Sequence, residues 1–139
     1  MSVRTPSIEE MSNKAAGEEL ARFEGTWRFV AGEADQRTVP AVDLSGASMV
    51  IKGNRASIAQ GGQTLEVVEL RVNPATQPKQ IDAVELEGPY KGAIALGIYE
   101  LDGDSLRICQ TWRGRTERPE NFEIEEGSRL VLVVWKRDS

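Results

Sequence analysis

One stretch near the middle of the chain limits the fold more than any other. Residues 92–111 read GAIALGIYELDGDSLRICQT, in which Asp102-Gly103-Asp104 separates two apolar runs. Asp-Gly between apolar runs predicts a β-hairpin, because Gly supplies the positive φ that the tight turn needs. Bulky residues alternate with small ones along the first run, and Gly97 in its middle indicates a bend or a close backbone approach. The stretch therefore predicts a curved or closed antiparallel sheet.

The same Asp-Gly-Asp sequence also matches the start of a calcium-binding loop. Such a loop needs a Glu at its twelfth position, and counting from Asp102 that position holds Arg113. We therefore favour a turn over a metal site.

Short strands separated by turn residues are predicted on both sides of this hairpin. Besides its own strands (93–101 and 105–111), they lie at about 27–30, 48–52, 55–60, 64–72, 80–86 and 129–137, and a short strand at 122–125 is a further option. This spacing, without βαβ alternation, is typical of a β-sandwich or an up-and-down barrel. The succession of hairpins favours an all-β, mainly antiparallel, up-and-down barrel of about eight strands that closes on itself.

A short helix is predicted before the first strand, over residues 8–22. Ser7 and Glu10 fit a capping box, and apolar residues recur on one face. We expect this helix to pack on the barrel as a lid or plug. The last strand is apolar from Leu130 to Trp135, so it is predicted to be buried on both faces or covered by the helix. The chain is then divided into a tail and helix (1–21) and one barrel domain (22–139).

Composition argues against several functional classes. The chain has 139 residues, no His, one Cys and a net charge of −5. The charge argues against non-specific nucleic-acid binding, and the scarcity of His and Cys argues against a zinc or haem site, so we expect no cofactor. No apolar run is long enough for membrane insertion, and the N-terminal MSVRTPSIEE lacks the apolar core of a signal peptide. We expect a cytoplasmic protein that is a monomer or a weak homodimer.

A family resemblance rests on motifs spread over residues 22–137. Gly25-Thr26-Trp27 resembles the G-x-W signature of lipocalins, which implies that Trp27 packs across the closed end of the barrel under a basic residue such as Lys136 or Arg137. Further matches, in order along the chain, are Val39-Pro40, Val50-Ile51-Lys52-Gly53, Pro78-Lys79-Gln80-Ile81-Asp82, Glu87-Gly88-Pro89, Lys91-Gly92, residues 96–107 (LGIYELDGDSLR), Arg118-Pro119 and Phe122. Together they look like the lipocalin-like paralogous domain family expanded in planctomycete-type bacteria. That family has no established biochemical activity, and Gln110-Thr111-Trp112 departs from its pattern.

Few side chains suggest catalysis. Cys109 has no His to activate it and is interpreted as a small buried hydrophobe. Acidic residues gather on two segments, and in an acidic protein we interpret them as solvated rather than catalytic. These residues are Asp82, Glu85 and Glu87 on one segment, and Glu100, Asp102 and Asp104 on the other. No catalytic residue is assigned, and an enzyme ranks third among the functions considered.

Two regions are candidates for ligand contact. Arg113, Arg115 and Arg118 lie beside Trp112, where guanidinium groups bind carboxylates and stack on aromatic rings, although pairing with neighbouring surface glutamates is the simpler interpretation. The barrel interior is the other region. It has few aromatic residues to fill it, and the small face of the 93–101 strand, with Ala56, Ala59 and Ala83, leaves room.

We therefore predict a non-catalytic barrel that binds a small apolar or amphipathic ligand. The candidate contacts are Tyr99, Gln110, Trp112, Arg115 and Arg118. The prediction requires an internal cavity on the scale of ~300 Å³, the lower end of the range for ligand pockets. The alternative is a protein-interaction module that uses the N-terminal helix or residues 113–128 as its contact surface.

Overall fold

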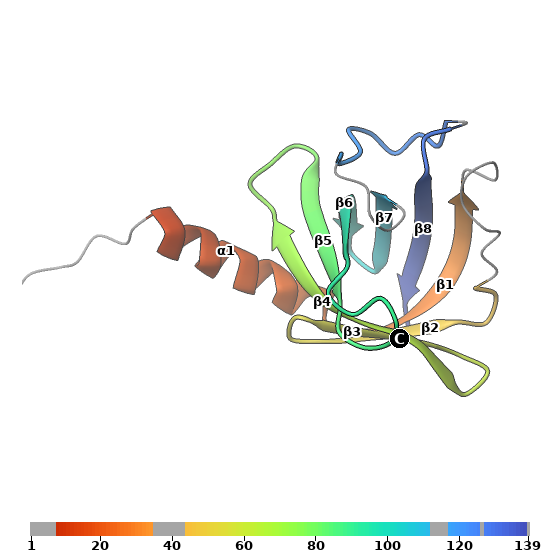
Figure 1. The fold of residues 1–139 in the computed structure, drawn as a ribbon. Helices are drawn as coiled ribbons and strands as arrows, with labels where there is room; N and C mark the ends of the chain where they lie inside the picture. The colour runs from red at the N-terminus through yellow and green to blue at the C-terminus, as the bar shows by residue number, and fades with distance from the viewer. Residues whose placement is uncertain (1–7, 35–43, 112–116, 126, 139) are drawn as a thin grey trace, which may run out of the picture.

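The structure is a computed structural model that describes residues 8–34, 44–111, 117–125 and 127–138. These contain one helix, α1 (Ile8–Phe23), and eight strands. The strands are β1 (Gly25–Ala34), β2 (Ser48–Lys52), β3 (Arg55–Gln60), β4 (Gln63–Asn73), β5 (Lys79–Glu85), β6 (Ile94–Asp102), β7 (Ser105–Thr111) and β8 (Leu130–Arg137). Each strand pairs antiparallel with the next, and β8 pairs with β1, so the sheet closes into a barrel (Figure 1). The predicted all-β up-and-down barrel with a short N-terminal helix is confirmed.

Three hairpins of the barrel are closed by two-residue loops that begin with Gly. The β6–β7 loop is Gly103-Asp104, and Gly103 has a φ of 58°. The β2–β3 and β3–β4 loops are Gly53-Asn54 and Gly61-Gly62. A positive φ at the first loop position suits the right-handed twist of the flanking strands, and only Gly adopts it without strain. The central hairpin therefore lies where the Asp-Gly signal predicts it.

The C-terminal end of α1 plugs one end of the barrel, and the rest of the helix extends away from it (Figure 1). Phe23, the last helical residue, is fully buried, and Glu19 is 5% exposed. Trp27 Nε1 donates a hydrogen bond to the Phe23 carbonyl oxygen at 2.8 Å, which ties the helix end to β1. The prediction of a plug is thus confirmed for the last turns of α1. No helix in the described part of the chain is long and apolar enough to cross a membrane.

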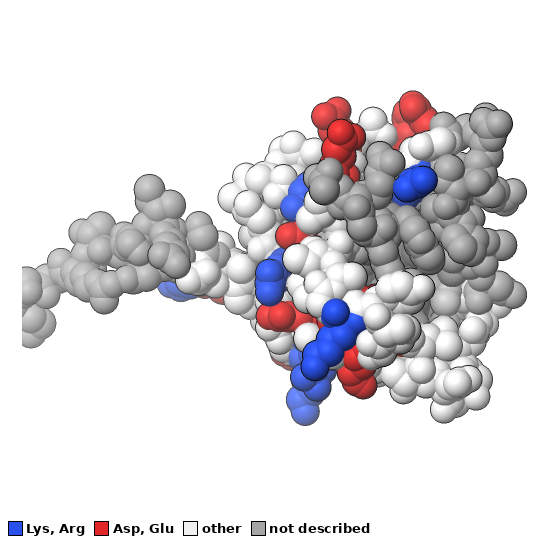
Figure 2. Space-filling view, in the orientation of Figure 1, with Lys and Arg blue, Asp and Glu red and all other residues white. Residues whose placement is uncertain are grey.

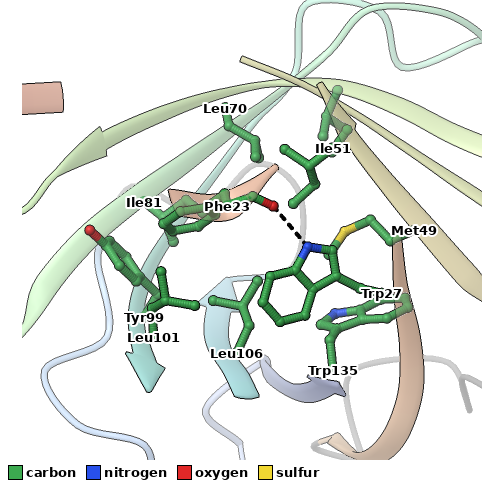
Figure 3. Packing of buried hydrophobic residues seen from close by; sticks show 12 residues of the cluster. Phe23, Trp27, Met49, Ile51, Leu70, Ile81, Tyr99, Leu101, Leu106 and Trp135 are labelled. Atoms are coloured by element: carbon green, nitrogen blue, oxygen red, sulfur yellow. Dashed lines mark hydrogen bonds between the residues drawn. The ribbon is translucent and has the colours of Figure 1, made fainter. Parts of the chain in front are cut away.

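Aromatic side chains fill the plugged end of the barrel, which we call the closed end (Figure 3). The rings of Phe23 and Tyr99 meet edge to face with their centroids 5.1 Å apart. The guanidinium carbon of Arg137 lies 4.3 Å from the centroid of the Trp27 ring, so the basic partner implied by the lipocalin resemblance is present. Arg137 also donates to the carbonyl oxygens of Glu24 and Arg22, which joins the end of β8 to the end of α1.

Two local predictions are wrong. Residues 122–125 form no strand; the segment lies against the outer wall of the barrel, where the Phe122 ring centroid is 3.9 Å from the guanidinium carbon of Arg107. β8 is neither buried on both faces nor covered by α1, whose main strand contact is with β4. Leu132 and Val134 on its outer face remain partly exposed. On its inward face the apolar run supplies Val131, Val133 and Trp135 to the barrel interior, whereas its outward residues are only partly covered.

Candidate functional site

A cavity of 220 Å³ lies inside the barrel. It extends from the closed-end cluster, where Met49 and Trp135 form its floor, towards the strand ends farthest from α1, which we call the distal end. Its walls are mainly aliphatic and include Leu70, Ile108 and Val133. Apolar walls around an empty volume can take up a small apolar molecule, since such cavities exclude water.

Small residues explain why the cavity exists at this level of the barrel. Ala56 and Ala83 line it, as the sequence predicts, whereas Ala59 does not. Ala95 on β6 is the cross-strand partner of Ala83, so the small face of β6 points inward and its bulky face points outward. The buried aromatic residues Phe23, Trp27, Tyr99 and Trp135 lie at or next to the closed end, so little side-chain volume remains for the distal half.

Two polar side chains interrupt the apolar wall, Glu66 on β4 and Gln110 on β7. Gln110 faces the cavity between Ile108, two residues earlier on the same face of β7, and its β8 partner Val131. Its partner on β6 is Gly97, which has no side chain, so the Gln110 side chain has room to reach inward. Among the residues that the structure describes, the Gln110 amide has no hydrogen-bond partner, and its atoms are not fully buried, so they are accessible. Glu85, which is 9% exposed, shares the inward face of β5 with Ala83.

A β-bulge shapes the distal rim of the cavity. Ile58 pairs with Glu66, but Ala59 pairs with Thr64, so Leu65 is an extra residue in β4. Strict alternation would place only one of two consecutive residues inside, yet both Leu65 and Glu66 line the cavity. Because Leu65 is also 48% exposed, it lies at the boundary between the cavity and solvent. Sequence reasoning missed both residues, since a bulge leaves no signal in the hydrophobic pattern.

The three predicted contact residues that the structure describes, Tyr99, Gln110 and Arg118, are not brought together. Gln110 lines the cavity. Tyr99 lies at the closed end, 2% exposed, and Arg118 lies on the outer wall of the barrel. Trp112 and Arg115 are outside the described residues, as is Arg113.

Tyr99 hydrogen-bonds to a buried carboxylate and does not line the cavity. Its hydroxyl donates a hydrogen bond to Glu19 Oε2, and Lys79 Nζ lies 3.3 Å from the same oxygen. Arg22 Nη1 is 2.8 Å from Glu19 Oε1. Burial alone would raise the pKa of Glu19, but these three donors outweigh it and lower the pKa below its usual value. Burial, and then the Glu19 hydrogen bond and charge, raise the pKa of Tyr99. The cluster fastens α1 to β5 and β6.

Arg118 interacts with β5 and β6 rather than with the cavity. Its Nη1 atom lies 2.6 Å from Asp82 Oδ1 and 2.8 Å from the Gly97 carbonyl oxygen, so it joins β5 to β6 from outside. The expected pairing with neighbouring glutamates is not the one observed for this residue. A surface cleft of 630 Å³ lies beside it, lined mostly by polar side chains and by Pro78 and Pro119. Because Asp82 already balances the Arg118 charge, this cleft is a weaker candidate than the barrel cavity.

The remaining charged groups offer no concentrated site on the described surface. On the face shown in Figure 2, basic and acidic side chains are interspersed rather than gathered by sign. Glu100 pairs with Arg107 at 3.1 Å, and Asp104 pairs with Arg137 at 3.0 Å. The described residues contain no group of three or more His, Cys, Asp or Glu side chains placed to hold a metal ion.

Cys109 is fully buried on the outward-facing side of β7. Burial raises the pKa of its thiol to about 11, and the charge of Arg107 only partly opposes this. The thiol is therefore protonated at neutral pH and fits the interpretation of Cys109 as a small buried hydrophobe.

Comparisons of the chain with protein-family models, with curated proteins and with solved structures found no match.

Proposed function

We propose that this protein binds a small apolar or amphipathic ligand, without catalysis, inside the barrel. The observation that carries the proposal is the 220 Å³ cavity with mainly aliphatic walls. Its volume exceeds the ~150 Å³ of an apolar cavity that accepts benzene and falls below the ~300 Å³ at which pockets for drug-sized ligands begin. The fitting ligand is therefore about the size of one ring with a short substituent.

We also propose membership of the lipocalin-like family suggested by the sequence motifs. Support comes from the closed eight-stranded meander and from the position of Trp27 under Arg137 at the plugged end. Eight-stranded barrels of this kind either fill their interior with side chains or hold one small ligand. The distal half of this barrel is not filled, which favours the second case.

The test is a comparison of two adjacent valines on β8. Val133 lines the cavity, whereas Val134 faces outward and does not. We expect an NMR titration with ethylbenzene to shift resonances of cavity-lining residues in the wild type and in Val134→Phe, but not in Val133→Phe, where the ring occupies the cavity. Native mass spectrometry of the purified wild-type protein would additionally identify any co-purifying ligand. Equal binding by both variants, or no binding by the wild type, would contradict the proposal.

A second candidate function is a protein-interaction module, and the observation that favours it is the projection of α1 from the barrel (Figure 1). Among the α1 side chains that the structure describes, from Asn13 onward, Glu19 and Phe23 in the last turns fasten the helix to the strands. The other surface suggested by the sequence is less available, because residues 118–122 contact the barrel wall. A partner captured by the wild type but not by a variant with polar substitutions in the first half of α1, while ethylbenzene fails to bind, would favour this function.

A further inference from the structure

Gln110 places a polar amide in the mainly aliphatic wall of the cavity. It is placed between Ile108 and Val131, and among the described residues it has neither a hydrogen-bond partner nor a charged partner. A primary amide carries two donor hydrogens and one acceptor oxygen. Because the Gln110 amide atoms are not fully buried, they are accessible to a polar group on a molecule in the cavity. A Leu at this position would continue the aliphatic wall and offer no hydrogen bond.

The surroundings of Gln110 leave space where a ligand group would meet the amide. A Cβ atom built on Gly97 would lie 3.1 Å from the Gln110 Cβ atom, so any larger residue at position 97 would crowd the Gln110 side chain. With Gly at this position, the amide is free to reach into the 220 Å³ volume. A hydroxyl or carbonyl oxygen on a bound molecule could then pair with it.

We propose that Gln110 recognises one uncharged hydrogen-bonding group, a hydroxyl or a carbonyl, on an otherwise apolar ligand. The inference rests on the proposed function and names the class of ligand that the cavity takes. The amide is neutral, so it offers no counter-charge to a carboxylate or an ammonium group. An anionic head group would also share the cavity with the carboxylate of Glu66. Small alcohols and ketones therefore fit this cavity better than hydrocarbons or acids of the same size.

Three probes of nearly equal shape test the inference: ethylbenzene, benzyl alcohol and benzylamine. Each is titrated by NMR into the wild-type chain, into Gln110→Leu and into Gln80→Leu. Gln80 is the matched control, because it lies on β5 but faces outward and does not line the cavity. The quantity compared is the ratio of the ethylbenzene Kd to the benzyl alcohol Kd, which is high when the protein prefers the alcohol. We expect this ratio to be about 2- to 12-fold higher in the wild type and in Gln80→Leu than in Gln110→Leu, which is the effect of one neutral hydrogen bond.

A second measurement does not depend on the stability of any variant. In the wild type, the side-chain NH₂ resonances of Gln110 should shift with benzyl alcohol and much less with ethylbenzene. An unchanged Kd ratio in Gln110→Leu, with both probes still binding, would overturn the inference and leave the proposed function standing. Tighter binding of benzylamine than of benzyl alcohol would overturn it in favour of recognition by a carboxylate. Failure of all three probes to bind the wild type would overturn both.

Discussion

Replacement of Gly97 by Ala should destabilise the barrel, although Ala is normally the more favourable residue within a strand. Gly97 lies in the middle of β6, between Ile81 on β5 and Gln110 on β7. A Cβ atom at this position would lie 2.9 Å from the Cys109 carbonyl oxygen and 3.2 Å from the Ile81 carbonyl oxygen. Both are backbone atoms held by the strand pairing, so rotation of a side chain cannot relieve the contacts.

Two opposing effects set the magnitude for Gly97→Ala. Overpacking of a well-filled site typically costs about 1–3 kcal/mol. The lower conformational entropy of the unfolded chain with Ala recovers about 0.4–1 kcal/mol. The net loss in the free energy of unfolding should therefore be about 0.5–2 kcal/mol. In addition, Gly97 presents its carbonyl oxygen to Arg118, so a displaced backbone also weakens the link to residues 117–125.

The matched control is Gly17→Ala in α1. Nothing lies within 4 Å of a Cβ atom at Gly17, and the residue is inside the helix. Ala should stabilise this position by about 0.5–1 kcal/mol through its higher helix propensity. The same chemical change is thus expected to have opposite signs at the two sites.

Urea unfolding followed by circular dichroism measures both changes. With an m value of ~2 kcal/mol/M, Gly97→Ala should lower the unfolding midpoint by roughly 0.3–1 M, whereas Gly17→Ala should raise it by a smaller amount. A Gly97→Ala protein as stable as the wild type would refute the reasoning, because it would mean that the strands separate at no cost.

Three further predictions concern the closed end and the buried thiol. Arg137→Lys should lower the free energy of unfolding, measured in urea, by about 1–3 kcal/mol. Lys keeps the charge but lacks the planar guanidinium group over Trp27 and its hydrogen bonds to two carbonyl oxygens. An unchanged unfolding midpoint would contradict this. The folded-state pKa of Glu19 lies below the ordinary value of 4.5, so its stabilising contribution is present above pH 4.5 and is lost as the pH falls through the folded pKa. Tyr99→Phe removes the hydrogen bond to Glu19 and should therefore lower the free energy of unfolding at pH 7 by about 1.5–3 kcal/mol. The loss should be smaller at the lowest pH at which the protein stays folded. An equal loss at both pH values would show that the Tyr99 hydrogen bond does not depend on the charge of Glu19. Cys109, with its pKa raised to about 11, should react with Ellman's reagent at pH 8 only after unfolding in urea, and rapid labelling of the native protein would show that the thiol is not buried.

The strands could be predicted from the sequence because their signals are local. Alternating side chains and Gly-containing turns place every strand except β1 within one residue, as for residues 64–72 against β4 (Gln63–Asn73). β1 (Gly25–Ala34) is longer at both ends than the predicted strand over 27–30. The G-x-W motif also placed Trp27 at the closed end under Lys136 or Arg137, and the structure shows Arg137 over its ring. The strands depend on residues that are adjacent in sequence, and the position of Trp27 depends on a motif whose family resemblance also implies a basic partner near the last strand.

Features set by distant residues could not be predicted. The sequence offers Arg118 several nearby glutamates, but its partner is Asp82, because residues 117–125 lie across the outside of β5 and β6. Tyr99 shares an inward face with the small residues of β6, but the position of the Phe23 plug decides that it lies at the closed end rather than in the cavity. The bulge at Leu65 likewise depends on how β3 and β4 pair. Pairing geometry of this kind has no local signal in a single sequence.

The division of the barrel into two halves connects these observations. Phe23, Trp27, Tyr99 and Trp135 are concentrated at or next to the closed end, and α1 supplies one of them, so this half is filled and cross-linked by Arg137 and Glu19. Towards the distal half Ala83 faces Ala95, and a cavity is left. Substitutions of closed-end residues that do not line the cavity, such as Tyr99 and Arg137, should therefore change stability without changing ligand selectivity. Gln110→Leu should change selectivity with little loss of stability. A barrel filled evenly from end to end could not separate the two effects, and that separation is what binding and unfolding measurements on the same variants would detect.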